Sequence, residues 1–140
     1  MLACAIIGID CHWAVPKGYE PASDVVERAT LLAKESGATM TQTHVPEEAV
    51  SGAHYVYTDA FVSMGEEHLE DKLGDFDGFQ VNLNLLSNAD SEWKFMHCLP
   101  AKRNQEVTAS VIDGSQSVVW DEAENRLHSQ KALLSALIHA

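Results

Sequence analysis

Short apolar runs alternate with segments of helical periodicity along this chain, and this alternation constrains the fold more than any other feature. Apolar runs that stop at Pro, Gly or polar residues are typical of buried strands, and the periodic segments between them indicate helices. That order of elements is typical of an α/β fold with a mainly parallel sheet. Because 140 residues suit one core, we predict a single Rossmann-like, three-layer domain over residues 1–140.

Turn residues and caps set the expected boundaries of these elements. Ser23 and Asp24 are expected to cap a helix that Gly37 ends, and Pro46 stands at a permitted first-turn position of a short helix. Residues 80–84 fit either a strand or an extended connector. Strands are expected at residues 12–15, 39–43, 55–58, 94–100 and 117–120, and helices at 23–36, 46–50, 69–76, 106–112 and 121–138.

Both ends of the chain suggest neighbouring structure beyond these residues. Residues 2–7 are apolar and follow no cap residue, so they are expected to be the tail of a helix that begins earlier, behind a truncated amino terminus. Residues 132–138 are apolar on nearly every side, and such a helix is normally buried on several faces. In a domain of this size, that pattern indicates a missing partner.

The formal net charge of -12 argues against partners with anionic surfaces. A strongly acidic protein repels phosphate backbones and anionic lipid, so we expect no nucleic acid and no membrane partner. The three cysteines, Cys4, Cys11 and Cys98, have no CxxC spacing and no secretory leader before them. Reduced thiols and a cytoplasmic location are therefore expected.

Three polar clusters fall near the expected strand ends, and the carboxyl ends of parallel strands meet at one edge of a sheet. Each cluster alone has a structural explanation: an Asp can cap a helix, a buried Cys can pack as a small hydrophobe, and an Arg can pair with acidic neighbours. The clusters are Asp59 with Ser63 and Met64, His97-Cys98 with Leu99, and Glu122 with Glu124, Asn125 and Arg126.

Taken together, the clusters can support group transfer from an anion to an amine. An ionised Asp59 can hold an ammonium group, and the Ser63 hydroxyl can complete its hydrogen bonds. Neighbouring strand residues point to opposite faces, which disfavours a nucleophilic pair of His97 and Cys98. Cys98 is instead expected to be a polarizable neighbour or a proton acceptor for an amine. Arg126 offers a permanently charged donor to a carbonyl or phosphoryl oxygen.

Metal and dinucleotide sites find little support in the pattern. The seven histidines form neither HxxxH nor HExxH spacing, and no GxGxxG run is present. We therefore expect no metal and no cofactor.

Two segments resemble the ornithine-side signatures of ornithine carbamoyltransferases: residues 58–66 (TDAFVSMGE) and 95–100 (FMHCLP). Residues 16–21 (PKGYEP) and 122–126 (EAENR) are similar to further segments of that family. The four segments occur in the family's order, so the resemblance covers essentially the whole chain and is far more specific than any single motif.

The resemblance implies transfer of the carbamoyl group of carbamoyl phosphate to the neutral δ-amine of ornithine, a step of arginine metabolism and the urea cycle that needs no metal or organic cofactor. It implies that Cys98 is catalytic, and that the Leu99 carbonyl oxygen is available to the carbamoyl nitrogen. The implied ornithine-binding residues are Asp59, Ser63 and Met64, and the implied carbamoyl-phosphate-binding residues are Cys98, Leu99 and Arg126.

The chain also departs from the family pattern. It has no counterpart of the amino-terminal carbamoyl-phosphate domain, and the fold is expected to lack its first strand. Family enzymes are trimers assembled mainly through that absent domain, onto which their last helix packs. Activity is therefore expected only with a separate carbamoyl-phosphate-domain chain, and formation of a trimer by this chain is in doubt.

Several alternatives stay open at this point. Residues 101–104 (AKRN) are less typical of the ornithine enzymes, so acylated ornithine or putrescine is an alternative substrate, although residues 63–65 (SMG) favour ornithine. A non-catalytic amino-acid-binding or regulatory module, or an inactive fragment, would carry the same segments.

Overall fold

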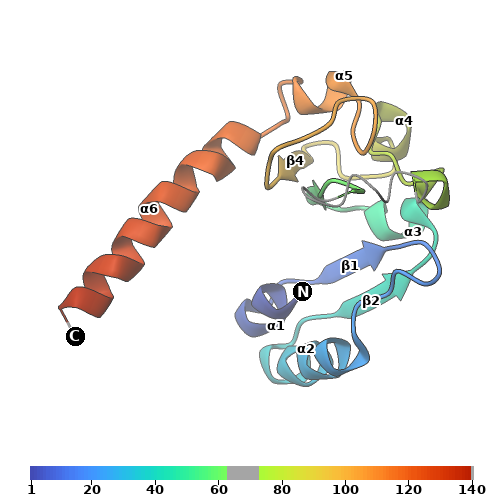
Figure 1. Cartoon of the computed structure of the whole chain (residues 1–140). Helices are drawn as coiled ribbons and strands as arrows, with labels where there is room; N and C mark the ends of the chain where they lie inside the picture. Colours follow the sequence, from blue (N-terminus) through green and yellow to red (C-terminus); the bar gives the residue numbers. More distant parts are fainter. Residues whose placement is uncertain (63–72, 140) are drawn as a thin grey trace.

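The computed structural model describes residues 1–62 and 73–139, in which helices and strands alternate along the chain (Figure 1). This alternation confirms the predicted α/β order. The elements are α1 (Leu2–Ile7), β1 (Cys11–Ala14), α2 (Ser23–Ser36), β2 (Met40–Thr43), α3 (Pro46–Val50), β3 (Tyr55–Thr58), α4 (Leu83–Leu86), β4 (Lys94–His97), α5 (Ala109–Ile112) and α6 (Val119–Ile138).

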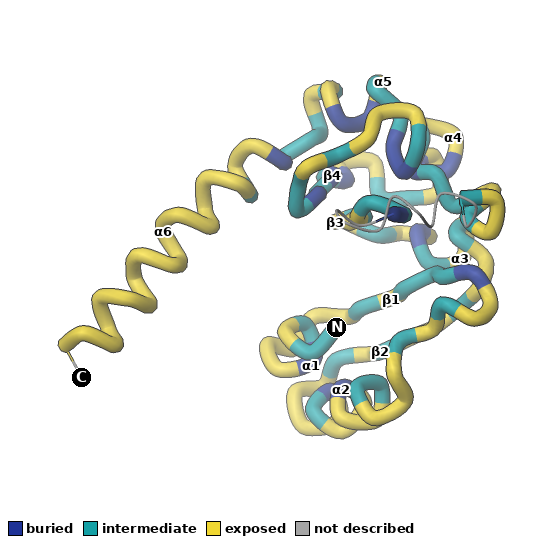
Figure 2. Tube along the Cα trace, in the orientation of Figure 1, coloured by how far each residue is buried: buried dark blue, intermediate teal, exposed yellow. Residues whose placement is uncertain are grey.

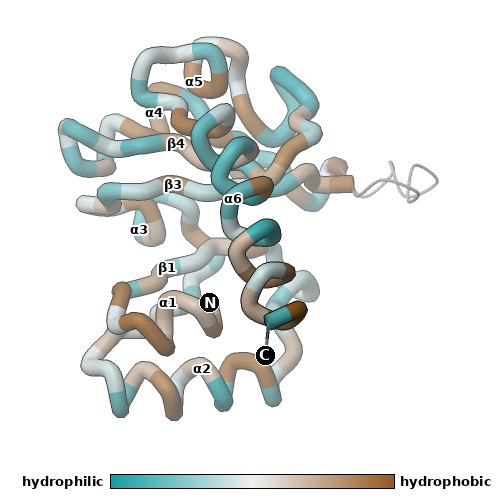
Figure 3. Tube along the Cα trace, turned by 90° about the vertical axis from the view of Figure 1, so that its left-hand side faces the viewer, coloured by the Kyte–Doolittle hydropathy of each residue, from teal (hydrophilic) through white to brown (hydrophobic). Residues whose placement is uncertain are grey.

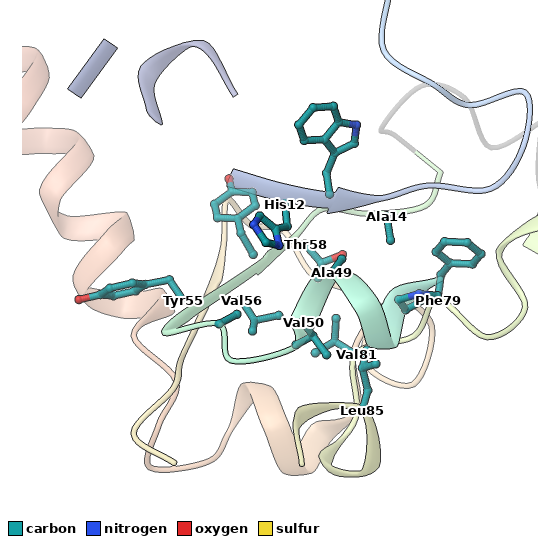
Figure 4. A pocket seen from close by; sticks show the side chains of 14 residues that line it. His12, Ala14, Ala49, Val50, Tyr55, Val56, Thr58, Phe79, Val81 and Leu85 are labelled. Carbon is teal, nitrogen blue, oxygen red and sulfur yellow. The ribbon is translucent and has the colours of Figure 1, made fainter. Parts of the chain in front are cut away.

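The strands form two parallel pairs, β1 with β2 and β3 with β4, which confirms the predicted parallel arrangement. Within the described residues, β1 and β3 each pair with one neighbour only, and the two pairs stay separate. A cavity of about 180 Å³ lies between β1 and β3, with α3 beside it (Figure 4). Trp13 and Ala14 line it from β1, and Tyr55 and Tyr57 line it from β3.

Two groups of buried side chains hold the chain together. The larger surrounds β4, where Phe95 is fully buried against residues of α3, α4, α5 and the start of α6. The smaller consists of Ala5, Ala29 and Ala33, which let α1 and α2 pack closely. The Ser36 hydroxyl also donates to the Ala5 carbonyl oxygen at 2.6 Å, which fastens the end of α2 to α1.

The helix ends follow the predicted pattern only in part. Gly37 ends α2 in a left-handed conformation with φ of 85°, and its N–H bonds to the Ala33 carbonyl oxygen, as predicted. The predicted cap by Ser23 and Asp24 is wrong, because the N-cap residue is Ala22 and no side chain caps α2. Ser23 already lies inside the helix, and Asp24 in the first turn faces the positive end of the dipole.

Four other boundary expectations are corrected or resolved by the structure. The strand expected at 117–120 is absent: Ser117 forms a single bridge to Phe95, and α6 begins at Val119. Residues 80–84 divide between a bridge at Val81 and the start of α4, which Asn82 caps by accepting from the Leu85 N–H at 2.9 Å. The helix expected at 106–112 covers only Ala109–Ile112. Of the helix expected at 69–76, residues 73–76 form a short 3₁₀ turn and 69–72 lie outside the described residues.

The last helix, α6, extends away from the rest of the chain and is exposed along nearly its whole length (Figures 1 and 2). Apolar side chains near its end are exposed to solvent. Figure 3, which colours the chain by hydropathy, shows the same part of α6 as brown segments beside polar ones. Its exposed large apolar residues are Trp120, Leu127, Leu133, Leu134, Leu137 and Ile138. Among the described residues, no helix is long and apolar enough to cross a membrane.

Candidate active site

The candidate site lies at the carboxyl ends of β3 and β4. The parallel register sets Thr58 beside His97, so the next residues, Asp59 and Cys98, leave the two strands as neighbours. The Cys98 thiol lies 3.1 Å from Asp59 Oδ1 as a hydrogen-bond donor. The same oxygen accepts from the Ala60 N–H at 2.7 Å. The structure thus brings Asp59 of the first polar cluster into contact with Cys98 of the second.

Burial and hydrogen bonding keep the Cys98 thiol protonated. Burial raises the pKa of Cys98, and its hydrogen bond to Asp59 raises it further. The pKa of the neighbouring Tyr57 is also raised, first by burial and then by its hydrogen bond with Cys98. At neutral pH, Cys98 is therefore a thiol that donates to Asp59, whereas a nucleophilic cysteine requires a lowered pKa. The expectation that Cys98 forms no nucleophilic pair with His97 stays a prediction.

Side chains bind the backbone of three consecutive residues at the end of β4, namely His97, Cys98 and Leu99. The His97 N–H donates to Glu122 Oε2 at 3.0 Å, and the Leu99 N–H donates to His97 Nδ1 at 2.9 Å. Arg126 Nη1 lies 3.5 Å from the Cys98 carbonyl oxygen, at the long limit of a hydrogen bond. Glu122 and Arg126 belong to the first turns of α6, so this helix brings two members of the third polar cluster to the turn.

The backbone of the turn has an unusual conformation. Leu99 has φ of 56°, in the left-handed region that residues other than Gly, Asn and Asp seldom adopt, and the Leu99–Pro100 peptide bond is cis. Within residues 1–62 and 73–139, no hydrogen bond reaches the Leu99 carbonyl oxygen.

Four of the six predicted site residues therefore lie together: Asp59, Cys98, Leu99 and Arg126. Ser63 and Met64, predicted for ornithine, lie outside the described residues.

The sequence does not single out Glu106, which is fully buried and lies 3.3 Å from His97 Nε2. An acid at the start of an expected helix is usually solvated, so no pattern distinguishes this one. Tyr57 is also missed, because alternate positions of a strand are ordinary places for aromatic residues.

Asp59, His97 and Cys98 have their candidate ligand atoms within 4.8 Å of one another, a spacing that a metal ion could use. However, both ring nitrogens of His97 already take part in hydrogen bonds, with Glu106 and with the Leu99 N–H. The thiol also holds its proton. A metal would have to replace these contacts, so the cluster carries no metal assignment, and the absence of a native metal stays a prediction.

Comparison with known proteins identifies the family to which the chain belongs. Residues 1–137 match the family described as "Aspartate/ornithine carbamoyltransferase, Asp/Orn binding domain". An ornithine carbamoyltransferase of Methanothermobacter thermautotrophicus is 52% identical over 139 residues, which are 99% of this chain and 46% of that protein. The chain therefore spans about half the length of this curated relative.

Solved structures agree with the sequence match. The ornithine carbamoyltransferase of Pyrococcus furiosus superposes with a TM-score of 0.90 at 48% identity, covering 95% of this chain and 43% of that one. An N-acetyl-L-ornithine transcarbamylase, solved with carbamyl phosphate and N-succinyl-L-norvaline, superposes with a TM-score of 0.81 at 29% identity, covering 96% and 42%. These superpositions confirm the Rossmann-like α/β fold, and with the match over residues 1–137 they show that the chain belongs to the aspartate/ornithine carbamoyltransferase family.

Proposed function

We propose that this chain supplies the ornithine side of a carbamoyltransferase, in which carbamoyl phosphate and ornithine give citrulline and phosphate. One observation carries the proposal: Asp59, Cys98, the Leu99 carbonyl group and Arg126 meet at the carboxyl ends of two parallel strands. Ligands of open α/β sheets bind at this edge. This place therefore holds an acid, a thiol, a carbonyl group and a guanidinium. The acid and the thiol suit an amine substrate, and the carbonyl group and the guanidinium suit an anionic carbamoyl donor.

In the proposed reaction, the neutral δ-amine attacks the carbamoyl carbon. The new C–N bond forms as the bond from that carbon to the phosphate oxygen breaks, and phosphate leaves with the electron pair. The amine must also lose a proton. The Cys98 sulfur can accept this proton as the thiol passes its own proton to Asp59 Oδ1, 3.1 Å away. The raised pKa of Cys98 makes this coupled transfer more suitable than attack by a free thiolate.

The remaining groups orient the substrates. The Leu99 carbonyl oxygen can accept from the carbamoyl nitrogen, and Arg126 can donate to the carbamoyl or phosphate oxygens. A local cation is needed there, because the formal charge of -12 repels an anionic substrate from the chain as a whole. Asp59, with Ser63 and Met64, holds the amino-acid end of ornithine in this proposal. No metal or organic cofactor takes part.

The chain is proposed to act only together with a carbamoyl-phosphate domain, carried by a separate chain or by a longer polypeptide. Two surfaces support this requirement. The facing edges of β1 and β3 have no strand between them among the described residues, and the cavity there is lined by both strands. One additional strand would join the two pairs into one parallel sheet. The apolar side chains of α6 are also exposed and suit a second protein surface. Assembly into a trimer is proposed only for the completed enzyme.

Citrulline formation from ornithine and carbamoyl phosphate tests the proposal directly. The chain is assayed alone and then with a fragment of a relative that carries the carbamoyl-phosphate domain and the additional strand, and activity only in the mixture is expected. A folded chain that gives no citrulline in either case would instead favour an amino-acid-binding module or an inactive fragment. Parallel assays with N-acetylornithine and putrescine decide the amine, and ornithine is expected to react fastest because putrescine has no α-amino group for Asp59 to hold.

Trp13 lines the cavity between β1 and β3 and can report on binding of the additional strand there. We expect the tryptophan emission to shift when the complementing fragment that carries this strand is added, because the indole leaves solvent. The Trp13→Phe variant should lose most of this shift. A shift of equal size in that variant would place the contact elsewhere, for example at the exposed Trp120.

A further inference from the structure

We propose that His97, held by Glu106, is a positioning residue that fixes the turn presenting Cys98 and the Leu99 carbonyl group to the substrates. This inference rests on the proposed function. It concerns a buried pair next to the turn, distinct from the groups that are proposed to contact the substrates.

The pair connects the core to the turn through one imidazole ring. His97 is 1% exposed and Glu106 is fully buried. The Leu99 N–H donates to His97 Nδ1 at 2.9 Å, so this nitrogen carries no hydrogen. The hydrogen of the neutral ring then lies on Nε2, which faces Glu106 Oε1 at 3.3 Å. The ring is thus bound at both nitrogens and can neither flip nor turn without losing a contact.

Glu106 ties the outgoing chain to the same ring. Its Oε1 also accepts from the Lys102 N–H at 2.5 Å, so the segment after Pro100 is fastened to the carboxylate that holds His97. Its second oxygen, Oε2, is buried and has no hydrogen-bond partner among the described residues. Burial of an acidic side chain with one oxygen unpartnered is costly, and replacing a buried polar pair by apolar residues of similar volume is often neutral or stabilising. Stability alone therefore gives a poor reason for this pair.

The conformation of the turn at Leu99 gives a better reason for the buried pair of His97 and Glu106. Leu99 lies at φ of 56°, a conformation that is unfavourable for a branched residue and persists only where its surroundings impose it. On the exposed side, Glu122 and Arg126 bind the His97 N–H and the Cys98 carbonyl oxygen. On the buried side, the imidazole of His97 binds the Leu99 N–H. Without that contact, the peptide unit between Leu99 and Cys98 can rotate, and the neighbouring Leu99 carbonyl oxygen and Cys98 thiol lose their placement.

Two amide variants separate positioning from simple core packing. In His97→Asn, the side-chain oxygen can stand near the position of Nδ1 and still accept from the Leu99 N–H, while the contact to Glu106 is lost. In His97→Gln, the amide nitrogen can stand near Nε2 and still donate to Glu106, while the acceptor for Leu99 is lost. Controls are Val111→Ala, which weakens the same core away from the turn, and His54→Ala, which removes an exposed histidine.

The first measurement uses this chain alone and needs no activity. Alkylation of each cysteine by iodoacetamide is followed by peptide mass spectrometry, with Cys4 and Cys11 as internal references. We expect His97→Gln to change the Cys98 rate by about two- to tenfold, the effect of losing one hydrogen bond that holds the turn. His97→Asn and both controls should leave the Cys98 rate close to that of the parent chain.

The second measurement uses the chain completed by a carbamoyl-phosphate domain. His97→Gln should lower kcat about 100-fold, as expected for a small misplacement of reacting groups, with a much smaller change in KM for ornithine. His97→Asn should retain most of kcat even where its thermal stability is as low as that of Val111→Ala. Equal loss of kcat in both variants, in step with thermal stability, would overturn the proposal.

The two measurements also separate this inference from the proposed function. If the completed parent protein forms no citrulline, the proposed function fails, and the alkylation rates still decide whether His97 holds the turn. An unchanged Cys98 rate in His97→Gln would refute the positioning role whatever the activity.

Discussion

Replacement of Asp59 by Asn removes one negative charge from the candidate site while keeping the shape of the side chain. Oδ1 of Asp59 accepts from the Ala60 N–H and the Cys98 thiol, and an Asn oxygen can accept from both. Asp59 is exposed, so the folded state should lose little, about 0.5 kcal/mol or less. The second oxygen, Oδ2, has no hydrogen bond to any described residue and is the group we assign to the ornithine ammonium.

The expected loss of affinity follows from the change in that contact. With the Asn oxygen at the position of Oδ1, the amide nitrogen takes the position of Oδ2 and cannot accept from the ammonium. The lost hydrogen bond to a charged group contributes about 1.5–3 kcal/mol, which corresponds to roughly 10- to 150-fold weaker binding of ornithine by Asp59→Asn. Asp59→Ala also removes the acceptor of the Cys98 thiol and should abolish measurable ornithine binding.

Isothermal titration of ornithine into the completed protein measures this effect, and thermal unfolding shows whether each variant is folded. Asp10→Asn is a matched control, because Asp10 Oδ1 also accepts from a backbone N–H, that of Thr39 at 2.7 Å, at a place remote from the site. It changes the net charge by the same amount and should bind ornithine normally. Unchanged ornithine affinity in a folded Asp59→Asn protein would refute the assignment of Asp59.

Three further predictions concern Cys98 and the core. Cys98→Ser should lower kcat of the completed enzyme by about 100-fold, because the proton path is altered, with a much smaller loss of thermal stability; parallel losses would mean that Cys98 is only a packing residue. Because the pKa of Cys98 is raised, its alkylation in the folded chain should reach half its maximal rate at a higher pH than in the chain unfolded in urea. The raised pKa also links the stability of the fold to pH. The contribution of the Cys98 thiol to the free energy of unfolding is fully present below the pKa of this thiol in the unfolded chain, and it should disappear as the pH rises through its pKa in the folded chain. Phe95→Ala should destabilise the chain by about 3–5 kcal/mol, measured by urea unfolding, because Phe95 is fully buried at the centre of the larger core; a loss below about 1 kcal/mol would show that this core is loosely packed.

The arrangement of α6 affects the site as well as assembly. The same helix supplies Glu122 and Arg126 to the turn and exposes apolar residues farther along. A partner that packs on α6 would therefore also steady these two side chains. This connection suggests a physical reason for activity only in the completed enzyme, besides the need for carbamoyl phosphate.

The sequence alone determined the order of elements and the edge of the sheet that carries the site. Apolar runs that stop at polar residues are a local property, so β1, β3 and β4 could be located from the pattern. The neighbouring positions of Asp59 and Cys98 also followed, because parallel strands bring their carboxyl ends together. The similarity of residues 58–66 and 95–100 to family segments then narrowed the chemistry.

Only the tertiary structure decided the contacts between residues distant in the sequence. The run 117–120 is apolar enough for a strand, but Val119 is buried as the first residue of α6, because packing against the core outweighs a weak local preference. The pairing of His97 with Glu106 was likewise hidden, since an acid in a polar segment gives no sign of burial. The separation of β1 from β3 is a property of strand order in space, which local patterns of hydrophobicity cannot encode. Local periodicity determines where strands and helices form, whereas long-range packing decides which polar groups are buried together and which strand edges stay unpaired.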